Sequence, residues 1–300
     1  MPILLFGLYS KAHGGFFLPN SLLLKRHALN SGTILRLLTL FRDSPDVYVL
    51  VVAALILLAW DTNANRRNCG GLKLFLLAAL LHQMLAAYGW FYRYEAYLVA
   101  FGVVMTLAAA WEIVDKPRHR AWFAAVILIL ASPLLLRGLA STYKTPHAMA
   151  DIYRQQIQMA EFFRTYYPNA PIAINDIGAI SFYGDPHITD IYGLGSTRIT
   201  RIRTKDPNKA GNITPGVLSI LKKNNVEVAA VYDSWYGLRE GNIPPDWIKV
   251  GAWRVPELTS LGSDTVSFYG MGKENAARLQ TNLAEFHAKL PPELQSYAVP

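Results

Sequence analysis

The sequence is poor in cysteine and in charged residues. Among its 300 residues there is one cysteine, Cys69, so no disulfide can form within the chain and a zinc site with several cysteine ligands is excluded. Charged residues make up 17% and hydrophobic residues 52%, which is apolar for a globular chain. There is no Gly-x-Ser-x-Gly elbow, P-loop, His-Glu-x-x-His or strand-associated Gly-x-Gly-x-x-Gly. We therefore expect neither a metal site nor a cofactor.

The positive charge is concentrated in the apolar half of the chain. Residues 1–139 hold 13 Lys and Arg against 6 Asp and Glu, whereas residues 140–300 hold 16 against 15. Basic residues beside apolar segments are typical of proteins that contact phospholipid headgroups or lipid phosphates. A nucleic-acid-binding module would carry its excess charge on a polar domain. We therefore expect membrane lipids and lipid phosphates as partners, and no nucleic acid.

Apolar segments dominate residues 47–136. They are Val47–Trp60, Leu72–Leu85, Ala96–Trp111 and Ala121–Leu136. Each is slightly shorter than the roughly 20 residues that cross a bilayer core, but aromatic residues at their ends would suit the membrane interface. The alternative is a set of buried helices in a protein without membrane spans. The prediction is an α-helical transmembrane bundle of about four spanning helices.

The charges of the short loops predict the orientation of this bundle. Loops 61–73 and 112–120 are the more basic ones, which places them in the cytoplasm. Residues 137–300 would then form an extracytoplasmic domain of a multi-pass protein of the inner (plasma) membrane.

Residues 1–46 are expected to hold the end of a membrane helix, an outer loop and interfacial helices. Met1–Tyr9 is apolar but too short to span a bilayer. In Asn20–Arg42, leucines recur at helical spacing with basic residues between them, which is the pattern of amphipathic helices at a membrane interface. Those basic residues either bind an anionic ligand or form a solvated face over lipid headgroups.

The pattern changes after Arg137 to short apolar strands that alternate with helices. Helices are predicted over 148–167, 215–223 and 274–289, and strands over 171–175, 188–192, 227–232, 247–255 and 265–269. This alternation predicts a small α/β domain over 137–300.

Three stretches are candidates for chemistry. The first is HGGFFLPNSLLLK, residues 13–25, which leads into the interfacial helices. The other two each have a structural alternative. In YGWFYRYEAY, residues 88–97, Arg93 and Glu95 either pair with each other or leave Arg93 to bind a phosphate, because a guanidinium fork matches phosphate oxygens. In INDIGAISFYGDPHITDIYGLGS, residues 174–196, Asp176 either caps the turn after a strand or binds the hydroxyl of an acceptor.

Three elements of the chain share a pattern with one known family. They are LPNS at residues 18–21 with Lys25 shortly after, GWFYRY at residues 89–94, and NDIGAI at residues 175–180 followed by DIYGL at residues 190–194. Together they resemble bacterial GT-C membrane glycosyltransferases, chiefly the arabinofuranosyltransferase- and mannosyltransferase-like members.

The resemblance implies an enzyme that takes a sugar from a polyprenyl-phosphate donor and transfers it to an envelope glycan, lipid or protein. On this basis Lys25 and Arg93 are expected to bind the donor phosphate. The expected substrate-binding residues are Asn20, Tyr94, Glu95 and Asp176.

The catalytic residue is not assigned. In the family, the catalytic aspartate lies in an earlier outer loop, so the resemblance implies that this chain corresponds to the C-terminal part of such an enzyme. It would be inactive alone, and a second polypeptide could supply the missing half. The alternative is a non-enzymatic membrane protein whose outer domain binds or scaffolds envelope partners.

Overall fold

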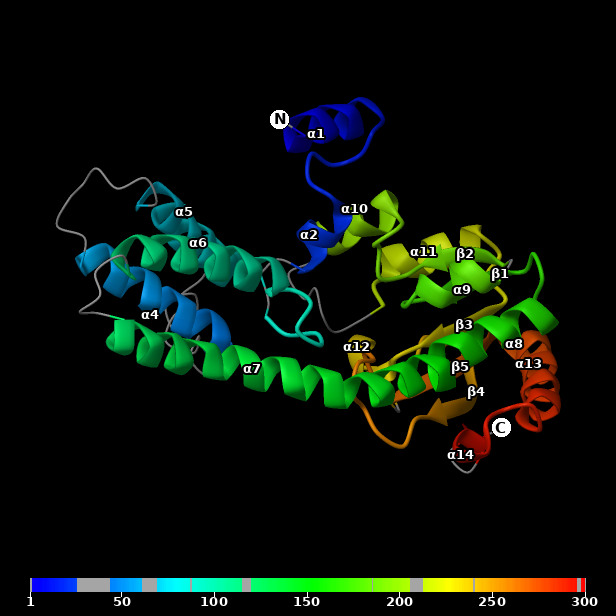
Figure 1. Cartoon of the computed structure of the whole chain (residues 1–300). Coiled ribbons are helices and arrows are strands. Elements are labelled where there is room, and N and C mark those ends of the chain that lie inside the picture. The colour runs from blue at the N-terminus through cyan, green and yellow to red at the C-terminus, as the bar shows by residue number, and fades with distance from the viewer. Residues whose placement is uncertain are drawn as a thin grey trace. The chain divides into compact units, whose positions relative to one another are not determined.

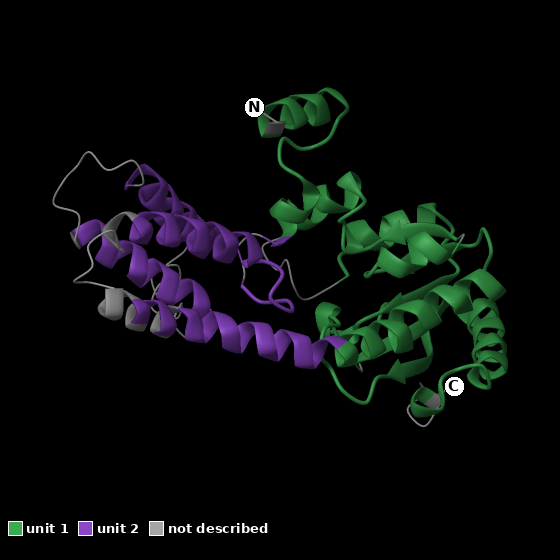
Figure 2. Ribbon diagram, in the orientation of Figure 1, with its two compact units in different colours: residues 1–24, 146–300 green, residues 25–145 purple. Residues whose placement is uncertain are grey.

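The protein divides into two compact units (Figure 2). The computed structural model describes residues 2–25, 44–60, 69–86, 88–114, 120–184, 186–205, 213–239, 241–295 and 298–299. Unit 1 comprises residues 1–24 and 146–300, and unit 2 comprises residues 25–145. The elements of both units are labelled in Figure 1.

Unit 2 is helical. Its helices are α4 (Pro45–Trp60), α5 (Cys69–Leu85), α6 (Ala96–Val114) and the larger part of α7 (Arg120–Asp151), which continues into unit 1. Leu50, Leu72 and Phe75 form the centre of the helix contacts and are almost fully buried. Gly102 of α6 allows a close approach, since a Cβ atom there would lie 2.7 Å from the Phe75 ring.

No helix in the described part of the chain is both long enough and apolar enough to span a membrane. Helices α4 and α5 have 16 and 17 residues, whereas a bilayer core requires roughly 20. The predicted transmembrane bundle of four spanning helices is therefore wrong, although all four apolar segments are helical. The predicted multi-pass membrane localisation, with its extracytoplasmic C-terminal domain, is wrong for the same reason.

The predicted interfacial helices fall largely outside the described residues. Only their first part is described, as the short helix α2 (Asn20–Lys25). Residues 26–42 lie outside the described part, as do residues 61–68 and 115–119 of the two basic loops. Met1–Tyr9, predicted as the end of a membrane helix, lies from Pro2 onward in helix α1 (Pro2–Ala12) of unit 1.

Unit 1 is built on a mixed sheet. The strands are β1 (Pro171–Ile174), β2 (His187–Asp190), β3 (Val228–Val231), β4 (Trp247–Arg254), β5 (Thr265–Met271) and β6 (Ala298–Val299). Within the described residues they are arranged in the order β2-β1-β3-β5-β4-β6. The pairs β1–β2 and β1–β3 are parallel, and the remaining neighbours are antiparallel.

Helices cover both faces of this sheet (Figure 1). The further elements of unit 1 are the π-helix η2 (Ile152–Ile157), α8 (Gln158–Tyr166), α9 (Gly178–Tyr183), α10 (Thr197–Lys205), α11 (Pro215–Lys223), α12 (Asp233–Tyr236), α13 (Gly272–His287) and α14 (Pro292–Gln295). Phe162 of α8 and Phe286 of α13 pack on one face, against Phe268 of β5. Ile199 of α10 and Ile220 of α11 pack on the other face.

The strand order places a topological switch point between β1 and β3. The chain passes from β1 to β2 on one side and then returns to β3 on the other side of β1. In open α/β sheets, ligands bind outside the carboxyl ends of parallel strands at such a point. The residues that follow Ile174 and Val231 therefore occupy the position in unit 1 where a ligand site is expected.

Candidate functional site

A left-handed turn in unit 2 presents two of the residues that the sequence singles out. Gly89, Trp90, Phe91 and Tyr92 have φ angles of 90°, 52°, 57° and 60°. For residues other than glycine this conformation costs about 1–2 kcal/mol each, because Cβ crowds the following carbonyl oxygen. Such strain persists only where surrounding contacts hold it, and it is concentrated at functional sites.

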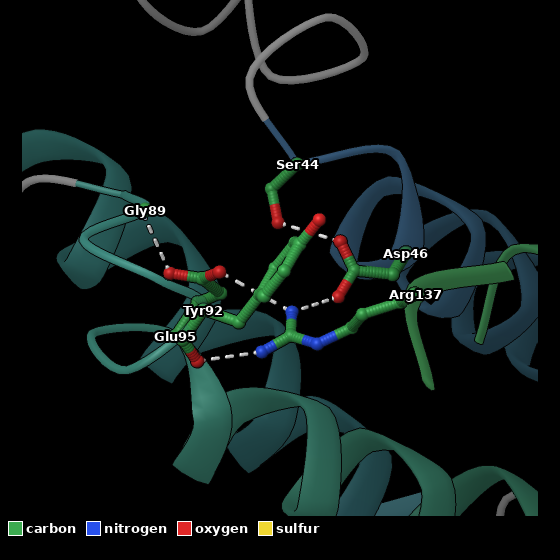
Figure 3. Close-up of polar contacts among 6 residues, drawn as sticks. All are labelled: Ser44, Asp46, Gly89, Tyr92, Glu95 and Arg137. Atoms are coloured by element: carbon green, nitrogen blue, oxygen red, sulfur yellow. Dashed lines mark hydrogen bonds and ion pairs between the residues drawn. The ribbon is translucent and has the colours of Figure 1, made fainter. Parts of the chain in front are cut away.

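A buried ion-pair network holds this turn (Figure 3). The guanidinium of Arg137 in α7 contacts the carboxylates of Asp46 in α4 and Glu95, which precedes α6. Its Nη2 also donates to the Tyr92 carbonyl oxygen at 2.7 Å, and the guanidinium carbon lies 4.9 Å from the Tyr92 ring centroid. The other Glu95 oxygen accepts from the Gly89 backbone N–H at 2.8 Å.

All four carboxylate oxygens of this network have a partner. Ser44 donates to the second oxygen of Asp46 at 2.8 Å, and Arg137 and Gly89 account for the others. The Asp46 and Glu95 side chains are only 6% and 3% exposed, and that of Arg137 is 14% exposed. Removing Arg137 would leave two buried carboxylates without a counter-charge, which is far more costly than losing a surface ion pair.

Two exposed cations lie at the residue that this turn leads to, Tyr94. The Lys25 ammonium donates to the Tyr94 hydroxyl at 3.1 Å, so it lies at the hydroxyl edge of the ring rather than over its face. The Arg93 guanidinium carbon lies 5.4 Å from the Tyr94 ring centroid. Both cations are exposed, whereas Tyr94 is half-buried. This arrangement can offer two cationic donors and a phenol hydroxyl to an anion.

The local charge also favours an anion. Lys25, Arg93 and Arg137 provide three positive charges against the two negative charges of Asp46 and Glu95. The two carboxylates are engaged by the buried Arg137, which leaves Lys25 and Arg93 as the outward-facing charges of this group.

A second polar cluster occupies the carboxyl ends of β1 and β3 in unit 1. Asp176 follows β1, and its Oδ2 accepts from Gln156 at 3.2 Å and lies 3.3 Å from the Tyr232 hydroxyl. The Tyr232 hydroxyl donates to Gln155 at 2.8 Å and accepts from Gln156 at 2.6 Å. Both glutamines belong to the π-helix η2, a type of element that is frequent at functional sites.

Two buried amide atoms in this cluster are left without a hydrogen bond. They are Nδ2 of Asn175 and Oε1 of Gln156, and both side chains belong to buried residues. The other end of each amide is engaged: Asn175 Oδ1 accepts from the Tyr232 backbone N–H at 2.9 Å. These two atoms are exceptions in a cluster whose other polar groups are hydrogen-bonded.

Burial raises the pKa of three tyrosine hydroxyls in unit 1 far above the usual tyrosine value, those of Tyr232, Tyr236 and Tyr269. For Tyr232 and Tyr269 the carboxylates of Asp176 and Asp233 act in the same direction as burial. For Tyr236 burial is the largest cause, and the nearby Arg203 opposes it. These phenols are therefore neutral hydrogen-bonding groups rather than candidate bases at neutral pH.

Asp190 shapes the loop after β2. Its Oδ1 accepts from the backbone N–H groups of Tyr192 and Gly193 at 2.9 and 2.8 Å, and its Oδ2 accepts from Gly195 at 2.6 Å. Asn20 reaches this loop and donates to the Leu194 carbonyl oxygen at 3.3 Å. Two of the elements that resemble glycosyltransferases, LPNS and DIYGL, thus meet within unit 1.

The structure distributes the residues expected to form the site between the two units. Lys25, Arg93 and Tyr94 lie together in unit 2, whereas Asn20 and Asp176 belong to unit 1. Glu95 is buried and bound by Arg137 and Gly89, so its carboxylate serves the turn. In the described part of the chain, no group of His, Cys, Asp and Glu residues has a geometry that could hold a metal ion.

Sequence reasoning missed the residues that support both clusters. Arg137 and Asp46 were not singled out, although each lies at the end of a long apolar run. Gln156 and Tyr232 were also missed, because a glutamine in a helix and a tyrosine at a strand end carry no distinctive sequence signal.

Comparison with known proteins gives one match. A family model described as a domain of unknown function (DUF8728) matches residues 148–269, which lie within unit 1. No curated protein and no solved structure matches the chain.

Proposed function

We propose that the chain binds a polyprenyl-phosphate-linked sugar and takes part in the transfer of that sugar to an envelope acceptor. In this reaction an acceptor hydroxyl oxygen attacks the anomeric carbon, and the bond from that carbon to the phosphate oxygen breaks. The bonding electrons leave with the polyprenyl phosphate, and the hydroxyl proton passes to a carboxylate base that a second polypeptide supplies. Lys25 and Arg93 stabilise the charge on the departing phosphate, and no residue of this chain is proposed as the base.

The observation that carries the proposal is the convergence of Lys25 and Arg93 on Tyr94. These residues are 68 positions apart in the sequence, yet the ammonium is bonded to the Tyr94 hydroxyl and the guanidinium lies beside the same ring. Both cations belong to elements that resemble the same family, so their proximity supports a shared ligand. A phosphate oxygen accepts readily from both groups.

Within unit 1, the carboxyl ends of β1 and β3 would bind a hydroxyl-bearing ligand at a position of their own. Asp176 is half-buried, and its carboxylate is oriented by Gln156 and Tyr232. A sugar hydroxyl can donate to this carboxylate.

A second candidate function is a binding module without catalysis. It is favoured by the internal engagement of the aspartates in the NDIGAI…DIYGL element. Asp190 is bound by three backbone N–H groups and Asp176 by Gln156 and Tyr232. These bonds show a structural use for both carboxylates, and unit 1 would then present a surface to an envelope partner.

Titration of the full chain with farnesyl phosphate, a short polyprenyl phosphate, tests the proposal. Lys25→Ala and Arg93→Ala should each weaken binding about tenfold, which corresponds to one charge-assisted contact of roughly 1.4 kcal/mol. Farnesol, which lacks the phosphate, should bind equally to all variants.

Lys223→Ala is the matched control, since Lys223 is an exposed lysine at the end of α11 in unit 1. It should leave the affinity unchanged. Equal affinity of the Lys25, Arg93 and Lys223 variants would contradict the proposal and favour the binding module.

A further inference from the structure

We propose that Arg137 is a positioning residue that, with Asp46 and Glu95, holds the left-handed turn and so fixes Arg93 and Tyr94 for the ligand. This inference rests on the proposed function for the identity of the ligand, a phosphate. The contacts that carry it concern the turn alone. Neither the sequence patterns nor the family match assigns a role to Arg137 or Asp46.

The contacts of Arg137 bracket the two residues that are offered to the ligand. Its Nη2 binds the carbonyl of Tyr92, the residue directly before Arg93, at 2.7 Å. Its Nη1 binds the carboxylate of Glu95, the residue directly after Tyr94, at 3.2 Å. Figure 3 shows both contacts of Arg137, and Arg93 and Tyr94 are the two residues between Tyr92 and Glu95 in the sequence.

The network joins three helices at the turn. Asp46 lies in the first turn of α4, Glu95 precedes α6, and Arg137 lies within α7. Glu95 returns to the start of the turn by accepting from the Gly89 N–H, which closes the loop from residue 89 to residue 95. Trp90 and Phe91, which have left-handed φ angles, therefore lie between two held residues. Gly89 before them is bound by Glu95, and Tyr92 after them is bound by Arg137.

The planar guanidinium fork is what this arrangement requires. One nitrogen contacts both carboxylates while a second reaches the carbonyl, and the plane lies beside the Tyr92 ring. A lysine would retain the positive charge but could not reproduce these contacts from one ammonium group. Arg137→Lys therefore separates the geometry from the charge.

Hydrogen exchange at Gly89 and farnesyl phosphate binding by the full chain test the inference together. Arg137→Lys should accelerate exchange of the Gly89 amide at least tenfold, because its acceptor Glu95 loses its anchor. It should also weaken binding about as much as Arg93→Ala. The variant that combines Arg137→Lys with Arg93→Ala should bind no more than twofold more weakly than either single variant. Both changes remove the same contact, that of Arg93 with the phosphate.

Asp46→Asn is the milder companion variant, because it keeps the side-chain shape and leaves Arg137 in place. It should accelerate exchange at Gly89 in the same direction, and it keeps the test decisive if Arg137→Lys unfolds. Arg164→Lys is the matched control: Arg164 is an exposed arginine of α8 with a surface ion pair to Glu161. It should change neither exchange nor affinity.

The outcomes separate the two proposals. Unchanged exchange at Gly89 in Arg137→Lys and Asp46→Asn would overturn the positioning role. Losses that multiply in the double variant would also overturn it, because Arg137 would then act independently of Arg93. Faster exchange at Gly89 in Arg137→Lys and Asp46→Asn would support the positioning role of Arg137. If Arg93→Ala and Lys25→Ala then kept wild-type affinity for farnesyl phosphate, the proposed phosphate ligand would be overturned.

Discussion

Asp190 offers the most direct test of how the loop after β2 is held in unit 1. Its carboxylate accepts three backbone N–H bonds from the loop after β2, at 2.6 to 2.9 Å, and the residue is only 5% exposed. Asp190→Asn keeps the size and shape of the side chain. It replaces one acceptor oxygen with an NH₂ group that must face a backbone donor.

The expected cost follows from the bonds that change. The remaining oxygen of asparagine can keep the bonds from Tyr192 and Gly193, whereas the bond from Gly195 is lost and two donors then face each other. A hydrogen bond to a charged group contributes about 1.5–3 kcal/mol, and the unpaired Gly195 N–H adds to the loss. We expect a destabilisation of unit 1 by about 2–4 kcal/mol.

Hydrogen exchange of the central strands measures this loss for unit 1 alone. Amides of β1 and β3 lie in the middle of the sheet and exchange through its global opening. A loss of 2–4 kcal/mol should therefore accelerate their exchange by about 30- to 700-fold. Exchange of α4 to α6 in unit 2 should remain unchanged.

Asp246→Asn provides the matched control, since Asp246 is an exposed aspartate directly before β4. Substitutions at such surface positions usually change stability by less than about 0.5 kcal/mol. If the Asp190 and Asp246 variants exchanged at the same rate, the carboxylate would not be what holds the loop. The assignment of a structural role to Asp190 would then be refuted.

Two further predictions concern the interior of unit 1. Phe162→Ala should destabilise unit 1 by about 3–5 kcal/mol in denaturant unfolding, because Phe162 is fully buried and contacts the rings of Trp253, Phe268 and Phe286; an exposed Phe182→Ala should change little. The raised pKa of Tyr232 also predicts a loss of stability in alkali. The unfolded phenol releases its proton near pH 10 while the folded one retains it, so stability is full below that pH and falls above it. In Tyr232→Phe, stability should decrease less steeply with rising pH than in Tyr143→Phe, which changes an exposed tyrosine. An equal slope in both variants would contradict the assignment.

Much of unit 1 could be predicted from the sequence because its strands are short apolar runs with clear ends. The strand predicted over 227–232 is β3, which is buried at every position. The strand predicted over 171–175 is β1. In contrast, the helix predicted over 148–167 is interrupted by the π-helix η2, which places Gln156 against Asp176. Hydrophobic spacing over one helix does not reveal a single widened turn, so this placement could not be read from the pattern.

The wrong prediction of membrane spans in unit 2 came from the apolar composition of its helices. The four apolar segments were identified as helices, and they are helices. Their composition suggested membrane spans, although two of the helices reach only 16 and 17 residues. Apolar composition alone does not predict a membrane span. The bilayer core has a fixed thickness that a spanning helix must match, whereas an apolar helix can also pack against other helices.

The candidate site was predictable only in part, because the residues proposed to bind the ligand and the residues that support the turn have different sequence signals. Lys25 and Arg93 stand in elements that resemble a known family, and the structure brings both to Tyr94. Asp46 and Arg137 are separated by 91 positions, and their contact depends on how α4 and α7 are rotated about their axes. No local pattern encodes that rotation.

Burial explains why the supporting residues must contact one another. Asp46, Glu95 and Arg137 lie at the ends of apolar segments, and a charge that packs among apolar helices must be paired to offset its lost hydration. Two carboxylates and one guanidinium in that position can satisfy each other only if they meet. The sequence patterns did not group these three residues, and the structure shows that their network closes on the backbone of the turn, at Gly89 and Tyr92.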